Sequence, residues 1–240
     1  MKNHKQKLFL YILTGILLFN VHSFGQQYKS SPNLTYFDDE WFHYGYLLGI
    51  NQSFFTIKLQ PDVLDNTAIN GLPLRSVEAI PSLGFNIGFV GNLRLAEHFD
   101  LRLTPTLTFA SKNIQYNFDT ESETKNVIST LVEFPLLVKF KGDRLHNLRP
   151  YIFTGGKYSY DLSGILRKQK KDEIKITLKP NDLAALGGVG FDFYTPYFKF
   201  AVEASMSYGF LDILKHEEGP YAAPLKKLSS KVFQLSITFE

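Results

Sequence analysis

The sequence Lys231-Val-Phe-Gln-Leu-Ser-Ile-Thr-Phe-Glu240 decides the fold. Apolar side chains occupy every second position of this stretch, and polar side chains fill the positions between them. A period of two is that of a β-strand with one apolar and one polar face. Such a strand, ending in an aromatic residue, is typical of the closing strand of an outer-membrane β-barrel. We therefore predict a C-terminal signal for barrel insertion in the apolar residues Phe233, Leu235, Ile237 and Phe239.

The first residues have the organisation of a secretory signal peptide. Three lysines precede a short apolar run over 8–19, and Ser23 and Gly25 place small side chains at the two cleavage positions. The run is shorter than the roughly 20 apolar residues of a membrane helix, so an uncleaved anchor is the less favoured alternative. We predict a cleaved signal peptide at 1–25, a short periplasmic lead-in at 26–41 and a barrel domain at 42–240.

The composition excludes several classes of protein. The 26 basic and 23 acidic residues nearly balance, and nothing in their distribution predicts a nucleic-acid partner. The absence of cysteine excludes disulfides, thiolate metal sites and a lipoprotein signal. Aromatic residues are abundant, with 22 Phe and 13 Tyr, yet mean hydropathy is only −0.10. Strands that alternate apolar and polar residues give this combination, as in an outer-membrane barrel of one domain.

Eight segments of alternating character follow the lead-in, and bacterial barrels have an even number of strands. They cover residues 42–55, 82–95, 99–113, 126–141, 149–162, 182–195, 197–210 and 231–240. We therefore predict an all-β fold, an eight-stranded antiparallel transmembrane up-and-down β-barrel.

The lengths of the connections between these segments alternate. Connections after the second, fourth and sixth segments are short, and the others cover about 56–81, 114–125, 163–181 and 211–229. Short periplasmic turns and long outer loops follow the same rule in known barrels. Pro105 and Pro135 interrupt two segments and predict bulges or barrel corners, because proline cannot donate a ladder hydrogen bond.

A charged set occupies the faces that would point into this barrel. Its members are Arg94, Arg102, Glu133, Lys139, Lys157, Asp161, Asp192, Lys199 and Glu203. An eight-stranded barrel is just wide enough to be filled by side chains, and buried charges must be paired. We predict an interior charge network that plugs the lumen. A proton or solute path is the alternative role for the same residues.

The sequence indicates no catalytic, cofactor or metal site. The histidines are His4, His22, His43, His98, His146 and His216. Only His216 falls in a predicted outer loop, and a loop histidine beside carboxylates is no catalytic site by itself. Gly187-Gly188-Val189-Gly190 lacks the lysine and helix of a phosphate loop, and predicts a strand with room for packing inside the barrel. We expect no enzyme activity and no cofactor.

Outward-facing aromatic residues are expected to form girdles at the two membrane interfaces. They are Tyr44, Tyr46, Tyr158, Tyr160, Tyr197, Tyr208 and Phe210. Contact with a protein partner is an alternative, because lipid and an apolar partner select the same side chains. The predicted loop 56–81 is the longest and the best candidate for contact outside the cell.

The chain resembles the PorT family, also called SprT, of small outer-membrane barrels from Bacteroidetes. The first matching stretch is Trp41-Phe-His-Tyr-Gly-Tyr-Leu-Leu-Gly-Ile-Asn51. The others are Leu131-Val-Glu-Phe-Pro-Leu-Leu-Val-Lys-Phe140, Asn147-Leu-Arg-Pro-Tyr151, Gly188-Val-Gly-Phe-Asp-Phe-Tyr-Thr-Pro-Tyr-Phe-Lys-Phe200 and Val232-Phe-Gln-Leu-Ser236. The Glu-Phe-Pro-Leu-Leu pattern is shared by many Bacteroidetes barrels, and the stretch around Tyr194-Thr-Pro-Tyr-Phe-Lys199 is the more specific one.

The resemblance implies a non-enzymatic component of the type IX secretion system, which exports proteins that carry a C-terminal signal domain and, in gliding bacteria, surface adhesins. The partners it implies are outer-membrane lipid, the barrel-insertion machinery and other type IX components, in the bacterial cell outer membrane. Three alternatives remain: a structural or adhesive barrel with no secretion role, a lipid-modifying barrel enzyme, and a soluble periplasmic barrel that binds a ligand inside.

Overall fold

The computed structural model describes residues 31–61, 68–69, 72–119, 121–163, 178–215, 221 and 223–240, except the side chain of Val127. Pro32–Glu240 forms one compact unit. The expected signal peptide and the start of the lead-in lie outside the described residues. Within the described part of the chain, no helix has the length and apolar character required to cross a membrane.

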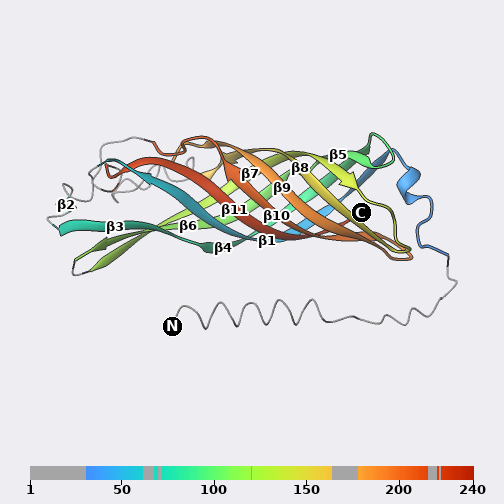
Figure 1. The fold of residues 1–240 in the computed structure, drawn as a ribbon, viewed down its shortest axis with the longest axis horizontal. Helices are drawn as coiled ribbons and strands as arrows, with labels where there is room; N and C mark the ends of the chain where they lie inside the picture. The colour runs from blue at the N-terminus through green and yellow to red at the C-terminus, as the bar shows by residue number, and fades with distance from the viewer. Residues whose placement is uncertain are drawn as a thin grey trace, which may run out of the picture. The chain divides into compact units, whose positions relative to one another are not determined.

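The described unit consists almost entirely of antiparallel strands that follow one another around a sheet (Figure 1). The 3-10 helix η1 (Phe37–Asp39) precedes them. The strands are β1 (Phe42–Leu59), β2 (Ala68–Ile69), β3 (Leu72–Ile80), β4 (Ser82–Arg94), β5 (Phe99–Leu103), β6 (Thr106–Phe118), β7 (Ser122–Lys141), β8 (Leu148–Asp161), β9 (Asn181–Tyr194), β10 (Lys199–Gly209) and β11 (Leu225–Phe239).

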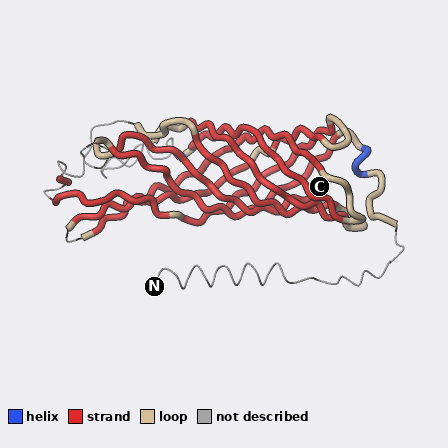
Figure 2. Tube along the Cα trace, viewed as in Figure 1, coloured by secondary structure: helices blue, strands red, loops and turns tan. Residues whose placement is uncertain are grey.

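The sheet closes on itself. Each strand from β7 to β11 pairs with its neighbours in the sequence, and β1 pairs with β11 on one side and with β4 on the other. The C-terminal stretch is therefore a closing strand, with Ile50 opposite Leu235 and Leu48 opposite Ile237. Figure 2 shows the resulting tube of crossing strands.

The structure divides the sheet into eleven strands, whereas the sequence predicts eight. One extra break lies at Thr104 and Pro105, between β5 and β6, and both of these strands pair with β4 and β7. Pro105 interrupts the ladder as predicted, but Pro135 lies inside the continuous strand β7. Pro81 separates β3 from β4, and β3 pairs with β6 instead of β1.

Two predicted long loops are wrong because strands extend farther than expected. The segment 56–81 contains the end of β1 and all of β2 and β3, and within 114–125 strand β6 continues to Phe118 and β7 begins at Ser122. Similarly, β11 begins at Leu225, inside the predicted loop 211–229. The three short connections lie together at 95–98, 142–147 and 195–198, at what we name the turn end. The opposite end, which holds 119–121 and β2, is the loop end.

The two faces of the sheet differ in polarity, and the difference reverses along β6. Near the middle of the barrel, Leu107 and Phe109 point outward while Thr106 and Thr108 are buried inside. Farther toward the loop end, the outward residues are Asn113, Gln115 and Asn117, and the buried ones are Ile114, Tyr116 and Phe118. The outer face near the middle of the barrel, which we name the lower part, therefore suits an apolar surrounding. The outer face toward the loop end, the upper part, suits water.

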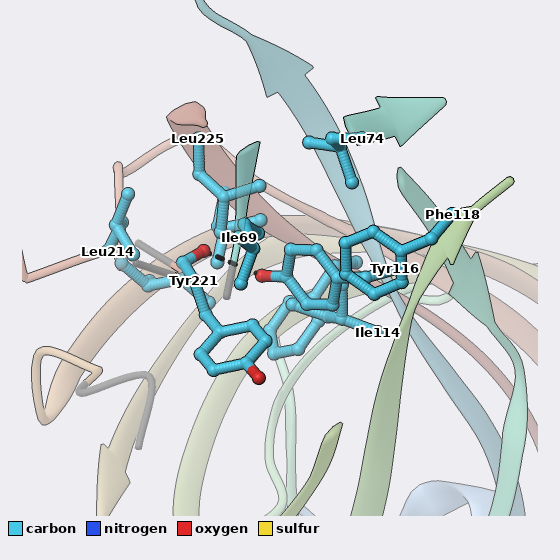
Figure 3. Close-up of a cluster of buried hydrophobic side chains, with 11 residues drawn as sticks. Ile69, Leu74, Ile114, Tyr116, Phe118, Leu214, Tyr221 and Leu225 are labelled. Atoms are coloured by element: carbon cyan, nitrogen blue, oxygen red, sulfur yellow. Dashed lines mark hydrogen bonds between the residues drawn. The ribbon is translucent and has the colours of Figure 1, made fainter. Parts of the chain in front are cut away.

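An apolar cluster fills the barrel at the loop end (Figure 3). Its buried residues are Phe55, Ile69, Leu74, Ile114, Tyr116, Phe118, Ile213, Leu214, Tyr221, Leu225 and Leu228. The Tyr116 hydroxyl donates to the backbone oxygen of Tyr221 at 2.7 Å, which ties the 221 region to β6. This end is therefore closed by a hydrophobic core of its own.

Candidate functional site

The centre of the polar interior is Arg102, a guanidinium from β5 that is only 1% exposed. It donates to Glu203 on β10, and its second terminal nitrogen lies 2.9 Å from Oε1 of Glu240. The Tyr151 hydroxyl donates to the same Glu203 carboxylate at 2.5 Å. A guanidinium with two carboxylate partners satisfies the requirement that a buried charge be paired and hydrogen-bonded.

Two lysines complete this lower layer. Lys139 Nζ donates to both oxygens of Asp192, at 2.8 and 3.1 Å, and lies 3.6 Å from the centre of the Tyr151 ring. Lys199 Nζ donates to Glu240 Oε2 at 2.9 Å. Each of these cations thus has a carboxylate partner, so the layer is held together across several strands.

A second layer lies closer to the loop end. Lys157 Nζ donates to Glu133 at 2.8 Å, and the hydroxyls of Thr108 and Ser159 donate to the same carboxylate at 3.0 and 3.2 Å. Asp161 accepts from the Ser129 hydroxyl at 2.9 Å. A cavity of about 30 Å³ borders this layer, which is room for roughly one water molecule. A second cavity, of about 20 Å³, lies between this layer and Glu203.

Eight of the nine predicted interior charges are buried inside the barrel: Arg102, Glu133, Lys139, Lys157, Asp161, Asp192, Lys199 and Glu203. The prediction that Arg94 points into the barrel is wrong. Because β4 ends at this residue, its side chain leaves the lumen and lies 3.4 Å from Asp39 on the lead-in, with 29% exposure. Sequence reasoning also missed the buried pair of Lys141 and Asp100, whose Nζ and Oδ1 are 2.7 Å apart. Strand parity would have found both, since they alternate inward with Lys139 and Arg102.

Residues 32–41 of the lead-in lie over the turn end, and we name them the strap. Asp38 holds the strap to the barrel through its side-chain contacts. The Asp38 carboxylate accepts from the Tyr194 hydroxyl at 2.9 Å and lies 3.1 Å from Arg149 Nη1. Arg144 donates to Asp38 at 3.5 Å and to the backbone oxygens of two strap residues. Phe37 stacks on the His43 ring, with 4.2 Å between centroids. A cavity of about 300 Å³ lies beside the strap.

The Gly-rich stretch of β9 makes room inside the barrel for the rings of Tyr151 and Phe153. A methyl group at Gly190 would lie 2.4 Å from the Tyr151 ring, and one at Gly188 would lie 2.5 Å from Phe153. The prediction of packing space inside the barrel is confirmed for these two glycines. At Gly187, by contrast, a methyl group would meet nothing closer than 3.8 Å.

The predicted girdle and insertion residues lie on the outer surface. Tyr44, Tyr46, Tyr158, Tyr208 and Phe210 are exposed, Tyr160 is half-buried, and Tyr197 is 90% exposed in the turn 195–198. The insertion residues Phe233, Leu235, Ile237 and Phe239 all point outward from β11. With the other exposed apolar side chains of the lower barrel, they form a surface suited to lipid.

The histidines are dispersed. His43 packs inside against Phe37, and His98 lies at the turn end, 3.4 Å from Asp143 Oδ1. His216 lies outside the described residues. No group of histidine and carboxylate side chains with the arrangement of a metal site occurs in the residues that the structure describes.

A family model described as outer membrane protein beta-barrel domain matches residues 24–215. The chain belongs to this family. Its fold is therefore an all-β, antiparallel, up-and-down outer-membrane barrel, and its place is the outer membrane. No curated protein matches the sequence.

Three solved structures give the extent of structural similarity. OprG from Pseudomonas aeruginosa has 13% identity over 88% of this chain and 96% of its own, with a TM-score of 0.48. Neisserial surface protein A has 9% identity over 83% of this chain and 98% of its own, with a TM-score of 0.43. Ail, the attachment invasion locus protein of Yersinia pestis, has 11% identity over 83% of this chain and 98% of its own, with a TM-score of 0.34.

Proposed function

We propose that this barrel is a non-enzymatic, accessory component of the type IX secretion apparatus, needed for the export of proteins with a C-terminal signal domain. The observation that carries the proposal is the location of the PorT-like residues. His43, Arg149 and Tyr194 belong to three separate PorT-like stretches, and all three contact the strap at the turn end. These stretches therefore build one face of the molecule, the kind of surface through which an accessory barrel would contact other components.

We further propose that the eleven strands form eight membrane-crossing positions around the barrel. In this count β5 and β6 share one position between β4 and β7, β3 is the continuation of β4 beyond Pro81, and the two-residue strand β2, which pairs with β3, is not counted. With short turns in the periplasm, the turn end and its strap face the periplasm and the loop end faces outward. The strap would then meet periplasmic partners of the apparatus.

The filled interior supports an accessory role over that of a translocation pore. Arg102 is buried and paired across the lumen with Glu203, and Lys139 and Lys157 are buried in the lumen and paired with Asp192 on β9 and Glu133 on β7. A polypeptide would have to break these pairs to pass, and each broken buried pair costs several kcal/mol, about 3 to 5. The same pairs argue against the alternative of a solute path. Cargo would instead be handled by the outer surface or the turn end.

A deletion strain tests the proposal. We expect proteins with the C-terminal signal domain to disappear from the medium and to accumulate unprocessed in the periplasm, as measured by mass spectrometry of both fractions. Complementation with the wild-type gene should restore export, whereas Tyr197→Ser, at the most exposed aromatic of the turn end, should restore it only in part. An unchanged secretome in the deletion strain would contradict the secretion role.

A structural or adhesive barrel is the second candidate, favoured by the closed, water-facing loop end. The apolar cluster and the pairing of β3 with β6 hold this end as a rigid platform. An unchanged secretome together with reduced surface attachment of the deletion strain would support this role instead.

A further inference from the structure

A cluster of lysines lies on the outer surface of β1 and β11, above the apolar band. Lys58 on β1 is directly opposite Lys227 on β11, and Lys231 lies four residues, or two outward steps, lower on β11, opposite Phe54. Lys226 is exposed beside the bulge at this point. We name Lys58, Lys227 and Lys231 the lysine rim.

The lysine rim is electrostatically unfavourable by itself. Side chains directly opposite each other on antiparallel strands are about 4.5 to 5.5 Å apart at Cβ, and like charges there destabilise the sheet. No carboxylate of the described chain pairs with Lys58, Lys227 or Lys231. Lys227 donates to the Phe210 backbone oxygen, which is a neutral acceptor. The acids Asp119 and Glu123, at the β6–β7 hairpin, pair instead with Arg75 and Lys125.

The height of the lysine rim matches the boundary of the lipid layer. Lys231 Nζ lies 5.5 Å above the Phe54 ring and 5.6 Å above the Phe233 ring, and Phe233 begins the exposed apolar run of β11. A long side chain at this level keeps its stem against lipid and its ammonium at the polar interface. Lys231 therefore lies at the level of the headgroups of the outer leaflet, and Lys58 and Lys227 lie two outward steps above it.

The opposite side of the barrel at this height carries no outward lysine on β6 or β7, and the charges exposed beside it are Glu78 on β3 and the Arg75–Asp119 pair. Its outward residues on β6 and β7 are Asn113, Gln115, Asn117, Thr124 and Asn126. Positive charge is thus concentrated on the β1–β11 side, instead of forming a uniform belt. A localised basic patch at a membrane interface is the form that recognition of anionic lipid headgroups takes.

We propose that the lysine rim binds the phosphate groups of a phosphorylated glycolipid of the outer leaflet. A phosphate would lie between Lys58 and Lys227 and relieve their repulsion, and Lys231, two outward steps lower, would contact the same headgroup from the membrane side. The acyl chains would lie along the exposed apolar surface of β1 and β11, against Ile50 and Leu235. This inference depends on the outer-membrane location and is independent of any role in secretion.

The test is native mass spectrometry of the full mature protein in detergent, titrated with bis-phosphorylated lipid A. We expect wild type and K58R/K227R/K231R to bind it, and K58Q/K227Q/K231Q to bind it on the order of a hundredfold more weakly. Arg94→Gln, which removes a cation at the opposite end, is the location control and should bind as wild type. Heat-modifiable migration on a gel shows that each variant is folded.

Three results would overturn the proposal. The first is unchanged affinity of the folded glutamine variant for lipid A. The second is equally tight binding of phosphatidylcholine, which would assign the contact to acyl chains alone. The third is full competition by inorganic phosphate at the concentration of the lipid, which would assign the rim to free phosphate.

Discussion

Arg102 and Glu203 form an ion pair across the full width of the barrel. Arg102 lies on β5 and Glu203 on β10, and three strand positions separate β5 from β10 in either direction around the ring. The two residues are 101 positions apart in the sequence. Their pairing therefore depends on closure of the whole ring and cannot form within any single hairpin.

Loss of this pair should destabilise the barrel strongly. Arg102→Met leaves two buried carboxylates, Glu203 and Glu240, without their guanidinium, and should lower the free energy of unfolding by about 3 to 5 kcal/mol. Urea titration in phospholipid vesicles, followed by the folded band on a gel, measures the change. Arg75→Met removes the exposed pair with Asp119 and is the control, which should unfold close to wild type. Equal effects of the two variants would contradict the buried network.

Gly190 should tolerate no side chain, because the Tyr151 ring occupies the space of its missing methyl group. Gly190→Ala should destabilise the barrel by about 1 to 3 kcal/mol, the usual cost of overpacking. Gly156→Ala is the matched control on the neighbouring strand, since an added methyl there meets nothing within 4 Å. The same urea titration compares them, and a neutral Gly190→Ala would show that Tyr151 does not pack there.

The C-terminal aromatic residue should act in assembly more than in stability. Phe239 and Phe89 lie on either side of Tyr46, each directly opposite it, and both point to the lipid. Phe239→Ala should reduce the amount of folded barrel in the outer membrane several-fold and leave protein in the periplasm. Phe89→Ala removes the same side chain without touching the insertion signal and should assemble as wild type. Equal assembly of both variants, measured by cell fractionation, would argue against the signal.

The strap should loosen when Asp38 loses its charge. Asp38→Asn weakens the contacts with Arg149, Tyr194 and Arg144, and hydrogen bonds to charged groups are worth about 1.5 to 3 kcal/mol. We expect amide exchange over residues 32–40 to be at least about tenfold faster. Asp39→Asn, whose carboxylate is 70% exposed and contacts Arg94 alone at 3.4 Å, should change exchange little. Mass spectrometry of peptides from exchanged protein distinguishes the two.

The alternation of the sequence predicted strands well where one face meets lipid. The segments 149–162 and 182–195 lie within one residue of β8 and β9. It missed β3, since this strand carries Pro73 and is held by pairing with β6 instead of by a clear apolar face. It also ended the third segment at 113, because beyond that point the apolar residues of β6 turn inward and the pattern reverses.

The charged interior was predictable as a set but not as pairs. Parity places Arg102, Lys139 and Asp192 inside, whatever the register of the strands. The partner of each depends on the stagger between strands that are distant in sequence, which one sequence does not reveal. Asp38 was missed for a different reason. It lies in an irregular segment, where no periodic pattern indicates which residues are buried.

The polarity of the inner and outer faces reverses along β6, so one continuous strand is stabilised in two different ways. Up to Lys112 the interior beside this strand is polar and largely ion-paired, and the outer face at Leu107 and Phe109 meets lipid; from Ile114 onward the interior is apolar and the outer face meets water. A substitution of asparagine by leucine on the outer face would therefore have opposite consequences in the two parts. In the part near the middle of the barrel it would favour membrane insertion, and toward the loop end it would create an exposed apolar patch that faces other cells. At a strand rise of about 3.4 Å per residue, the five residues from Ile114 to Phe118 extend about 17 Å along the strand. The barrel thus extends beyond the bilayer, and its loop end is stabilised by an apolar interior, as in a water-soluble domain.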